Sequence, residues 1–554
     1  MSTVVKYENP IVPGFAPDPS VVLVDSIYYL VTSSFHIFPG IPIYASEDLQ
    51  SWKLIGHGIN RSNQLSLENA TTNYVTLDTG HGMAGTGGLY APTIRHHDGI
   101  FYIVCTNCIS FPDGTGKSDN FIISTKNIWS GDWSDPMYFP FKGIDPDLYF
   151  DDDGRAYVQG SWRIDRTKQP SCTIKQYEID IATGSPLEEP REIWGGFARY
   201  DTEGPHIYKK DRWYYLLVAE GGTFEHHMLS IARSQLIQGP YETGPANPVM
   251  TADRKKEYVQ NVGHGEIFQD VDGQWWAAVL GLRDEAGWPL GRETFLTPVS
   301  WPEGEWPTVD QPRMSFDRSK PSRTDARLSN KTSSPVTEIS KVAATIASKK
   351  ANREDAARPH NSGTLEHVYI RNVDLEKFRF NPSKSSVVSL SPTAGDLTSP
   401  RGSMTFLGMR QRTLQCSAKV TLDTPTPESS STCDTVAGFS VYKDHLRHAS
   451  ITYATRTNTL SFNVINATQE LSRTTNISIE SSFQKLRFEI RASPKQYVFM
   501  YQCEDAEDFK ELGSVLVTEL FARDFTGPIF GIFAQSPNPV AGWINFSDFE
   551  INTW

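Results

Sequence analysis

The sequence predicts an all-β protein: a five-bladed β-propeller followed by a C-terminal β-sandwich of jelly-roll type. In the first 300 residues a strand–turn–strand pattern restarts five times, and each copy contains an aromatic-rich strand. Period-two alternation of apolar and polar residues returns near residue 365, which predicts the sandwich. The length of 554 residues and the aromatic content of 12% agree with two or three packed domains.

Each copy of the repeat has a small polar or acidic start, a short apolar strand, a turn and an aromatic strand. The copies read PDPSVVLVDSIYYLVTSS, APTIRHHDGIFYIVCTN, DPDLYFDDDGRAYVQGS, GPHIYKKDRWYYLLVAE and GHGEIFQDVDGQWWAAVLG, with anchors at Tyr28, Tyr102, Tyr157, Tyr214 and Trp276. Asp-Gly pairs at Asp98-Gly99, Asp153-Gly154 and Asp272-Gly273 favour hairpins. A long β-sandwich would explain the strands, but the periodic restart favours a propeller.

The start of each repeat is expected to lie at one mouth of the central channel, because the first strand of a blade lines the axis. Counting back ten to twelve residues from each anchor gives Asp18, Pro92, Asp145, Glu203 and His264. Three of these five positions are carboxylates. Asp145 has rivals nearby in Asp147 and in the acidic run at Asp151, Asp152 and Asp153, which is expected to form a solvated turn.

Several carboxylates at one mouth indicate cleavage of glycosidic bonds. That reaction needs one carboxylic acid to protonate the leaving oxygen and one carboxylate to direct water or to attack. A third carboxylate beside the acid raises the pKa of that acid by repulsion between like charges. The predicted mouth therefore contains a complete set of groups for a glycosidase.

Six ordered motifs resemble glycoside hydrolase family 43, in particular its two-domain β-xylosidases. They are NPIVPGFAPDPS, GGLYAPTI, GIDPDLYFDDDG, TEGPHIYKKDRWYYL, NVGHGEIF and PLGRETFLTPV, and the resemblance covers about residues 8–310 and 365–554. It implies that Asp18 is the general base, Asp145 the pKa modulator and Glu203 the general acid of an inverting enzyme. It also implies exo-action that releases terminal xylose from β-1,4-xylo-oligosaccharides.

The same resemblance implies substrate-binding roles for other residues. Arg292 would hold sugar hydroxyls, although an ion pair with Glu293 or Asp284 is an alternative. Phe35 and Tyr90 would line the pocket, with core packing as the alternative. Tyr90 stands where the family usually has Trp, so this chain departs from the family pattern at a pocket-lining position. His264 would lie beneath the sugar, where some members hold a water or a calcium-like ion; no cofactor is expected to be required.

The chain is expected to divide into a propeller at 1–312, a linker or insertion at 313–364 and a sandwich at 365–554. Within the linker, ISKVAATIASKKANREDAA has the apolar spacing of a short helix. In the family the sandwich narrows the propeller mouth, and FTGPIFGIF matches that region. The resemblance therefore implies that Phe525 closes the pocket, with a place in the sandwich core as the alternative.

The net charge, the apolar stretches and the N-terminus indicate which partners and which location are expected. The net charge of −13, without a basic block, argues against nucleic acid and favours a small neutral oligosaccharide. No stretch approaches the apolar length of a membrane span, and the N-terminus lacks the pattern of a signal peptide, so a cytoplasmic protein is expected.

Cys105 and Cys108 form a C-x-x-C without further ligands and are interpreted as buried thiols, so no metal site is expected. The sequence does not fix the oligomeric state and is compatible with a homo-oligomer.

Three alternative functions remain open at this stage. An α-L-arabinofuranosidase, or an enzyme with both activities, is the nearest, because arabinofuranose and xylopyranose present similar hydroxyl groups. A carbohydrate-binding propeller without turnover predicts the loss of a carboxylate, yet all three are present. A retaining fructan-type hydrolase expects an Asn-Asp-Pro-Asn-Gly start, which this sequence lacks.

Overall fold

The structure is a computed structural model of the 554-residue chain. It describes residues 3–76, 82–165, 168–320, 363–381, 386–424, 434–480, 483–504, 506–537 and 542–553. The helix expected within 339–357 lies outside these residues. Among the described helices, none has the length and apolar character needed to cross a membrane.

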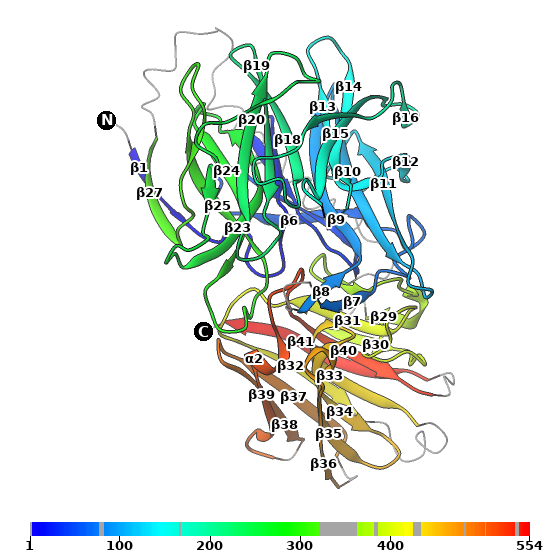
Figure 1. The fold of residues 1–554 in the computed structure, drawn as a ribbon. Helices are drawn as coiled ribbons and strands as arrows, with labels where there is room; N and C mark the ends of the chain where they lie inside the picture. The colour runs from blue at the N-terminus through cyan, green and yellow to red at the C-terminus, as the bar shows by residue number, and fades with distance from the viewer. Residues whose placement is uncertain are drawn as a thin grey trace, which may run out of the picture.

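Five antiparallel sheets, each built from one continuous stretch of the chain, make up most of the N-terminal domain (Figure 1). The first contains β2 (Ser20–Val24), β3 (Ile27–Val31), β5 (Gly40–Ser46) and β6 (Lys53–Ile59). The second contains β9 (Gly88–His97), β10 (Ile100–Ser110), β11 (Gly116–Thr125) and β12 (Met137–Phe139). The third contains β13 (Gly143–Phe150), β14 (Ala156–Arg163), β15 (Cys172–Asp180), β16 (Ser185–Pro186) and β17 (Arg191–Trp194).

The fourth sheet contains β18 (Glu203–Lys210), β19 (Trp213–Glu220), β20 (Met228–Ser234), β21 (Glu242–Thr243) and β22 (Met250–Thr251). The fifth contains β23 (Val259–Gln269), β24 (Trp275–Arg283), β25 (Glu293–Ser300) and β26 (Thr308–Val309). The first strands contact one another in sequence, from β2 through β9, β13 and β18 to β23, and β23 contacts β2. This closed ring confirms the predicted five-bladed propeller, with the first strands around its axis.

The two ends of the propeller domain are joined by a separate pair of strands. β1 (Thr3–Glu8) pairs with β27 (Ser315–Lys320), from Thr3 opposite Lys320 to Glu8 opposite Ser315. The side-chain amide of Asn9 donates to the carbonyls of Leu296 and Arg313, at 2.8 Å each. Residues 315–320 are therefore ordered with the propeller, although the sequence placed them in a linker; their charged and polar composition hid an edge strand that alternates in exposure.

The Asp-Gly pairs lie in turns between the first two strands of their blades. Asp98 and Gly99 both have positive φ, of 49° and 75°, and form the two-residue turn between β9 and β10. In the turn at Asp151–Asp153, Asp152 and Asp153 are exposed as expected, with side chains 81% and 51% exposed, but Asp151 is not. Asp151 is 9% exposed, and its carboxylate accepts a hydrogen bond from Tyr214 at 2.6 Å and pairs with Lys209 at 2.9 Å.

The C-terminal domain is a sandwich of two antiparallel sheets. One sheet contains β29 (Phe378–Phe380), β30 (Val387–Leu390), β41 (Ile544–Thr553), β32 (Cys416–Asp423), β37 (Lys485–Ala492), β38 (Gln496–Cys503) and β39 (Lys510–Leu516). The other contains β31 (Thr405–Arg410), β40 (Ile529–Gln535), β33 (Val436–Asp444), β34 (Arg447–Ala454), β35 (Thr459–Asn466) and β36 (Leu471–Ser478). Short helices lie at η1 (Leu375–Lys377), η2 (Ala467–Gln469) and α2 (Val517–Leu520).

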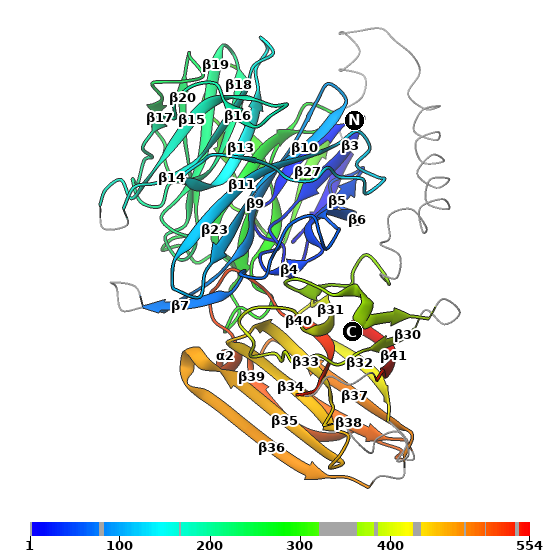
Figure 2. The same ribbon diagram turned by 90° about the vertical axis from the view of Figure 1, so that its right-hand side faces the viewer.

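The two domains share a seam of backbone pairing and apolar packing. β28 (Tyr369–Ile370) pairs with β4 (Ile37–Phe38) of the propeller. The hairpin of β7 (Thr72–Thr76) and β8 (Gly82–Thr86) extends beside the sandwich in both ribbon views (Figure 2). One buried cluster joins Phe15, Phe35 and Ile37 of the propeller to sandwich residues that include Phe406 and Ile529. The sandwich is thereby fixed against the face of the propeller that carries the predicted mouth.

Candidate active site

All eight residues singled out in the sequence line one cavity of about 970 Å³. The volume lies at the upper end of the range typical of small-molecule pockets. The eight are Asp18, Phe35, Tyr90, Asp145, Glu203, His264, Arg292 and Phe525. The structure therefore places them together, while their chemical roles remain predictions. Asp147, the nearest rival of Asp145, is fully buried elsewhere on the axis.

The mouth of the propeller has the same strained backbone in every blade. Asp18, Ala91, Asp145, Gly204 and His264 all have positive φ, of 56°, 37°, 54°, 53° and 32°. Four of these residues are not glycine, and such conformations persist only where the surrounding structure holds them. The count from the anchors identified three of the five positions and selected the adjacent residues Pro92 and Glu203 in place of Ala91 and Gly204, because the spacing to the anchor varies between ten and twelve residues from blade to blade.

Asp18 is a buried carboxylate with strong partners. Ser33 donates its hydroxyl proton to Oδ2 at 2.6 Å, and Nη1 of Arg292 donates to Oδ1 at 3.3 Å. Burial by itself would raise the pKa of Asp18, but Arg292, His264 and Ser33 together hold that pKa below its ordinary value. Asp18 is therefore ionised near neutral pH.

Asp145 has the opposite protonation behaviour. Burial and the negative charge of Asp18 raise the pKa of Asp145 to about 8, although the backbone N–H of Gly204 donates to its carboxylate. Like-charge repulsion thus acts on Asp145 from Asp18, whereas it was expected from the sequence to act on Glu203. At pH 6–7 Asp145 holds a proton, and its contact with Gly204 links it to the residue that follows Glu203.

Glu203 begins β18 and is half-buried at the cavity wall. The equivalent mouth position of this blade is Gly204, and a Cβ built there would lie 2.8 Å from the ring of His264. A side chain is therefore excluded at 204, and the carboxylate of this blade stands one residue earlier than in the other blades.

His264 lies between the two aspartates. Its Nδ1 is 3.8 Å from Oδ1 of Asp18 and 3.9 Å from Oδ2 of Asp145. Burial lowers the pKa of His264 to about 4, against the attraction of Asp18, so the ring is neutral near pH 7. Across the described ranges, His, Cys, Asp and Glu side chains form no group of three or more that could hold a metal ion.

Arg292 connects Asp18 to the sandwich. Its Nη1 donates to Thr223 Oγ1 at 3.0 Å as well as to Asp18, and its Nε and Nη2 donate to the Phe525 carbonyl at 3.3 and 3.1 Å. The alternative pair with Glu293 does not form, because Glu293 pairs with Arg283 at 2.8 Å. Arg292 is 5% exposed and points its guanidinium into the cavity wall.

Three aromatic rings form one wall of the cavity. The Phe525 ring, which comes from the sandwich, stacks on Phe35 with centroids 5.8 Å apart and meets Tyr90 edge-on at 6.0 Å. Phe35 meets Tyr90 at 4.9 Å. Phe525 is half-buried and lines the cavity, so it is not simply a core residue of the sandwich.

Several cavity residues escaped sequence reasoning. Thr223 comes from the glycine-rich segment GGTFEHH, whose glycines were a signal for a loop at the mouth. Cys108, expected to be a buried thiol, is half-buried and lines the cavity, whereas Cys105 is fully buried. Arg523 and Trp288 meet at the cavity edge, with the guanidinium 4.3 Å from the ring centroid. Arg523 belongs to the sandwich and Trp288 to the propeller, so no local sequence pattern indicates their contact.

Comparison with known families identifies both domains. The family model described as glycosyl hydrolases family 43 matches residues 7–307. A second model, described as beta xylosidase C-terminal Concanavalin A-like domain, matches residues 365–552.

Curated relatives match about half of the chain. A non-reducing end alpha-L-arabinofuranosidase of Bacteroides ovatus is 40% identical over 306 residues, which are 55% of this chain and 53% of the relative. A beta-xylosidase of Bacillus subtilis is 35% identical over 320 residues, which are 55% of this chain and 57% of the relative. The match thus spans about half the length of these curated relatives.

A solved structure matches both domains. The crystal structure of a xylan beta-1,4-xylosidase from Bacillus halodurans has a TM-score of 0.81 at 26% identity, covering 99% of this chain and 100% of that one. A second solved structure, from Bacteroides ovatus, has a TM-score of 0.78 at 28% identity with the same coverage.

Proposed function

The chain belongs to glycosyl hydrolases family 43, and from this premise we propose that it is an exo-acting, inverting glycosidase. The proposed reaction releases terminal xylose from β-1,4-xylo-oligosaccharides. One observation carries the proposal: the three carboxylates predicted from the sequence, Asp18, Asp145 and Glu203, line a single cavity, and near neutral pH Asp18 is ionised whereas Asp145 is protonated.

In the proposed mechanism Asp18 accepts a proton from the water that attacks the anomeric carbon. Glu203 donates a proton to the leaving oxygen from the other side of the sugar ring. The attacking oxygen forms the new bond as the glycosidic bond breaks, so the anomeric configuration inverts. These steps need only carboxylates and water, and we propose that no cofactor takes part.

Asp145 is proposed to tune this pair of residues. Its proton lies beside the charge of Asp18, and its carboxylate accepts the N–H of Gly204, directly after the proposed acid. Loss of that proton would place a second negative charge in the cavity and disturb both Asp18 and the backbone that orients Glu203.

The aromatic wall supports action at a chain end. Phe525 covers the cavity from the sandwich side and is held by Arg292. A cavity covered in this way accepts a terminal sugar more readily than the middle of a long chain. Arg292 offers a planar set of donors that suits neighbouring hydroxyl groups.

An α-L-arabinofuranosidase, alone or together with xylosidase activity, is the second candidate. The observation that favours it is the Bacteroides ovatus relative, which is named for that activity and is 40% identical over 306 residues. Initial rates on an aryl β-D-xyloside and an aryl α-L-arabinofuranoside, measured side by side, will rank the two activities. NMR of the released sugar will show whether the first-formed anomer is inverted.

Two substitutions test the catalytic roles. Asp18→Ala and Glu203→Ala are each expected to lower kcat on the preferred aryl glycoside by about 10²–10⁴-fold, because each removes an acid–base group. Asp153→Ala is the matched control, since its carboxylate is 51% exposed in a turn away from the cavity. Near-normal turnover in either catalytic variant, with an unchanged unfolding midpoint, contradicts the assignment.

A further inference from the structure

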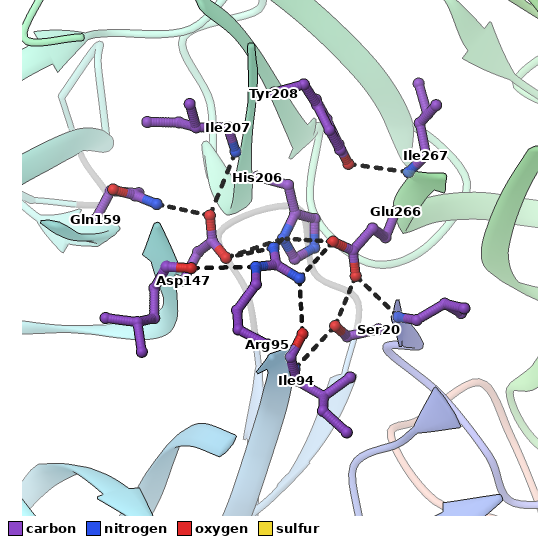
Figure 3. Close-up of polar contacts among 12 residues, drawn as sticks. Ser20, Ile94, Arg95, Asp147, Gln159, His206, Ile207, Tyr208, Glu266 and Ile267 are labelled. Atoms are coloured by element: carbon purple, nitrogen blue, oxygen red, sulfur yellow. Dashed lines mark hydrogen bonds and ion pairs between the residues drawn. The ribbon is translucent and has the colours of Figure 1, made fainter. Parts of the chain in front are cut away.

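A buried polar cluster lies on the propeller axis, and each of the five blades supplies one side chain to it (Figure 3). This axial cluster consists of Ser20 on β2, Arg95 on β9, Asp147 on β13, His206 on β18 and Glu266 on β23. Ser20, Asp147, His206 and Glu266 are at most 3% exposed, and the side chain of Arg95 is 16% exposed. None of the five is among the residues that line the cavity.

Arg95 is the centre of the cluster. Its Nη2 pairs with Oδ1 of Asp147 at 2.5 Å, and its Nη1 pairs with Oε1 of Glu266 at 2.6 Å. Its Nε donates to the Leu148 carbonyl at 3.1 Å, and Nη2 lies 3.2 Å from Nδ1 of His206. One planar guanidinium thus contacts three other blades directly, which a point charge on a flexible stem cannot reproduce.

The two carboxylates extend these links to the remaining strands. Oε2 of Glu266 accepts hydrogen bonds from Ser20 Oγ at 2.6 Å and from the Val21 N–H at 2.9 Å, both on β2. Oδ2 of Asp147 accepts from Gln159 at 2.6 Å and from the Ile207 N–H of β18 at 3.3 Å. All five inner strands are therefore joined by bonds to buried charges.

The axial cluster lies one step deeper than the candidate active site on the same strands. Ser20 is two residues after Asp18, Asp147 is two after Asp145, and Glu266 is two after His264. Bulges interrupt β13 between Ile144 and Asp147 and β23 between Gly263 and Gly265, at the residues with positive φ. A cluster residue thus lies two residues behind the strained mouth residue in four blades, and four residues behind it in the second blade.

We propose that Arg95 is a positioning residue that holds the bulged strand ends of the five blades in the arrangement needed for catalysis. This inference rests on the proposed function for its kinetic consequence. Without the guanidinium, two buried carboxylates would face each other on the axis without the cation that joins them, a situation that is strongly unfavourable. The inner strands would then separate, and Asp18, Asp145 and His264 would move with them.

Three variants test this role. Arg95→Met removes the charge and keeps much of the apolar stem, whereas Arg95→Lys keeps the charge without the planar fork. Arg233→Met is the matched control, because Arg233 also pairs with a carboxylate, Glu242, and stacks on Trp213, but lies on β20 away from the axis. If Arg95→Met does not fold, Arg95→Lys is compared with the wild type and with Arg233→Met in the same measurements.

Hydrogen–deuterium exchange followed by mass spectrometry gives a readout that does not depend on turnover. Arg95→Met is expected to speed exchange in peptides that contain 16–22, 143–148, 203–208 and 262–267, with outer strands such as β6 and β12 unchanged. Unchanged exchange at these four segments overturns the proposal, and so does a uniform increase over the whole propeller. If the wild-type protein hydrolyses neither aryl glycoside, the proposed function fails, while this comparison still decides the role of Arg95.

Kinetics give the second readout. Arg95→Met is expected to lower kcat by about 10–100-fold, because small misplacements of reacting groups have effects of this size. KM should stay within about twofold, since Arg292 and the aromatic wall are held from outside the cluster. Arg95→Lys should recover part of the loss, and Arg233→Met should match the wild type. Equal proportional changes in kcat and KM, or an unchanged kcat, overturn the proposal.

Discussion

The propeller and the sandwich each bury a cluster of charged side chains, and the two clusters differ in composition and reach. The axial cluster places one guanidinium between two carboxylates and joins five strands that are distant in sequence. The sandwich cluster consists of Lys443, Asp444, Arg447 and Asp524, each at most 1% exposed. Its two cations balance its two carboxylates, and three of its members lie within five residues of one another.

The sandwich cluster fixes one loop instead of a ring. Asp524 pairs with Lys443 at 2.9 Å and with Arg447, and it directly precedes Phe525. The Phe525 carbonyl then accepts from Arg292, which pairs with Asp18. The two clusters are therefore expected to have different kinetic roles. The propeller cluster should orient the reacting groups and affect kcat. The sandwich cluster should hold the pocket closed and affect KM.

Breaking the sandwich cluster is expected to have the largest effect on stability. Asp524→Asn leaves two buried cations with one carboxylate, and removal of one partner of a buried pair typically costs about 3–5 kcal/mol. Urea unfolding should show this loss, and KM should rise more than kcat falls, because the Phe525 loop is released. Asp434→Asn, in an exposed pair with Arg456 of the same domain, is the control and should change stability by less than about 1 kcal/mol. An Asp524→Asn variant with wild-type stability and KM would contradict the role proposed for the sandwich cluster.

The next largest effect is expected in the pH dependence of the free energy of unfolding, to which Asp145 contributes. Its folded-state pKa of about 8 lies above the ordinary value of 3.8, so the folded protein binds this proton more tightly than the unfolded chain. Stability from this group is therefore present at low pH and is lost as pH rises toward 8, by about 1.4 kcal/mol per pH unit. Asp145→Asn, which cannot ionise, should gain about 2–3 kcal/mol relative to the wild type between pH 5 and pH 7.

The measurement is the free energy of unfolding of both proteins at the two pH values. Turnover by Asp145→Asn should also depend less on pH than that of the wild type as pH rises toward 8, because the amide cannot acquire the second negative charge that would disturb Asp18 and the backbone beside Glu203. Parallel stability curves would show that Asp145 is not held protonated by the fold. Asp434→Asn again serves as the control, since its exposed carboxylate should show no such trend.

The contrast between the regions also explains what the sequence could predict. Asp18, Asp145 and His264 were identified because each opens a repeat and repeats preserve their register. Pro92 was one residue late and Glu203 one residue early, because the distance from the mouth to the anchor differs by up to two residues between blades, which periodicity alone does not resolve. The strand at 315–320 was missed because its partner, β1, lies some 300 residues away.

Neither charge cluster was predicted from sequence. Asp147 was noticed as a rival of Asp145, yet nothing local shows that it faces Arg95 and Glu266 from other blades. Asp524 lies 77 residues from Arg447, so their contact depends on how the sandwich strands are ordered. Phe525 was placed at the pocket through resemblance to a family and not through its own sequence context. Long-range pairing of charges, in both domains, is the information that local patterns lack.

The smallest effect is expected where the two regions meet in solvent. Arg523 of the sandwich pairs with Glu225 of the propeller at 2.5 Å, with side chains 35% and 45% exposed. Exposed pairs contribute about 0–1 kcal/mol and weaken with salt. Glu225→Gln should therefore change the unfolding midpoint and KM only slightly at low salt and not at all near 1 M salt, because Arg523 remains stacked on Trp288. A large rise in KM that persists at high salt would show that this exposed pair, and not the buried cluster around Asp524, holds the sandwich against the pocket.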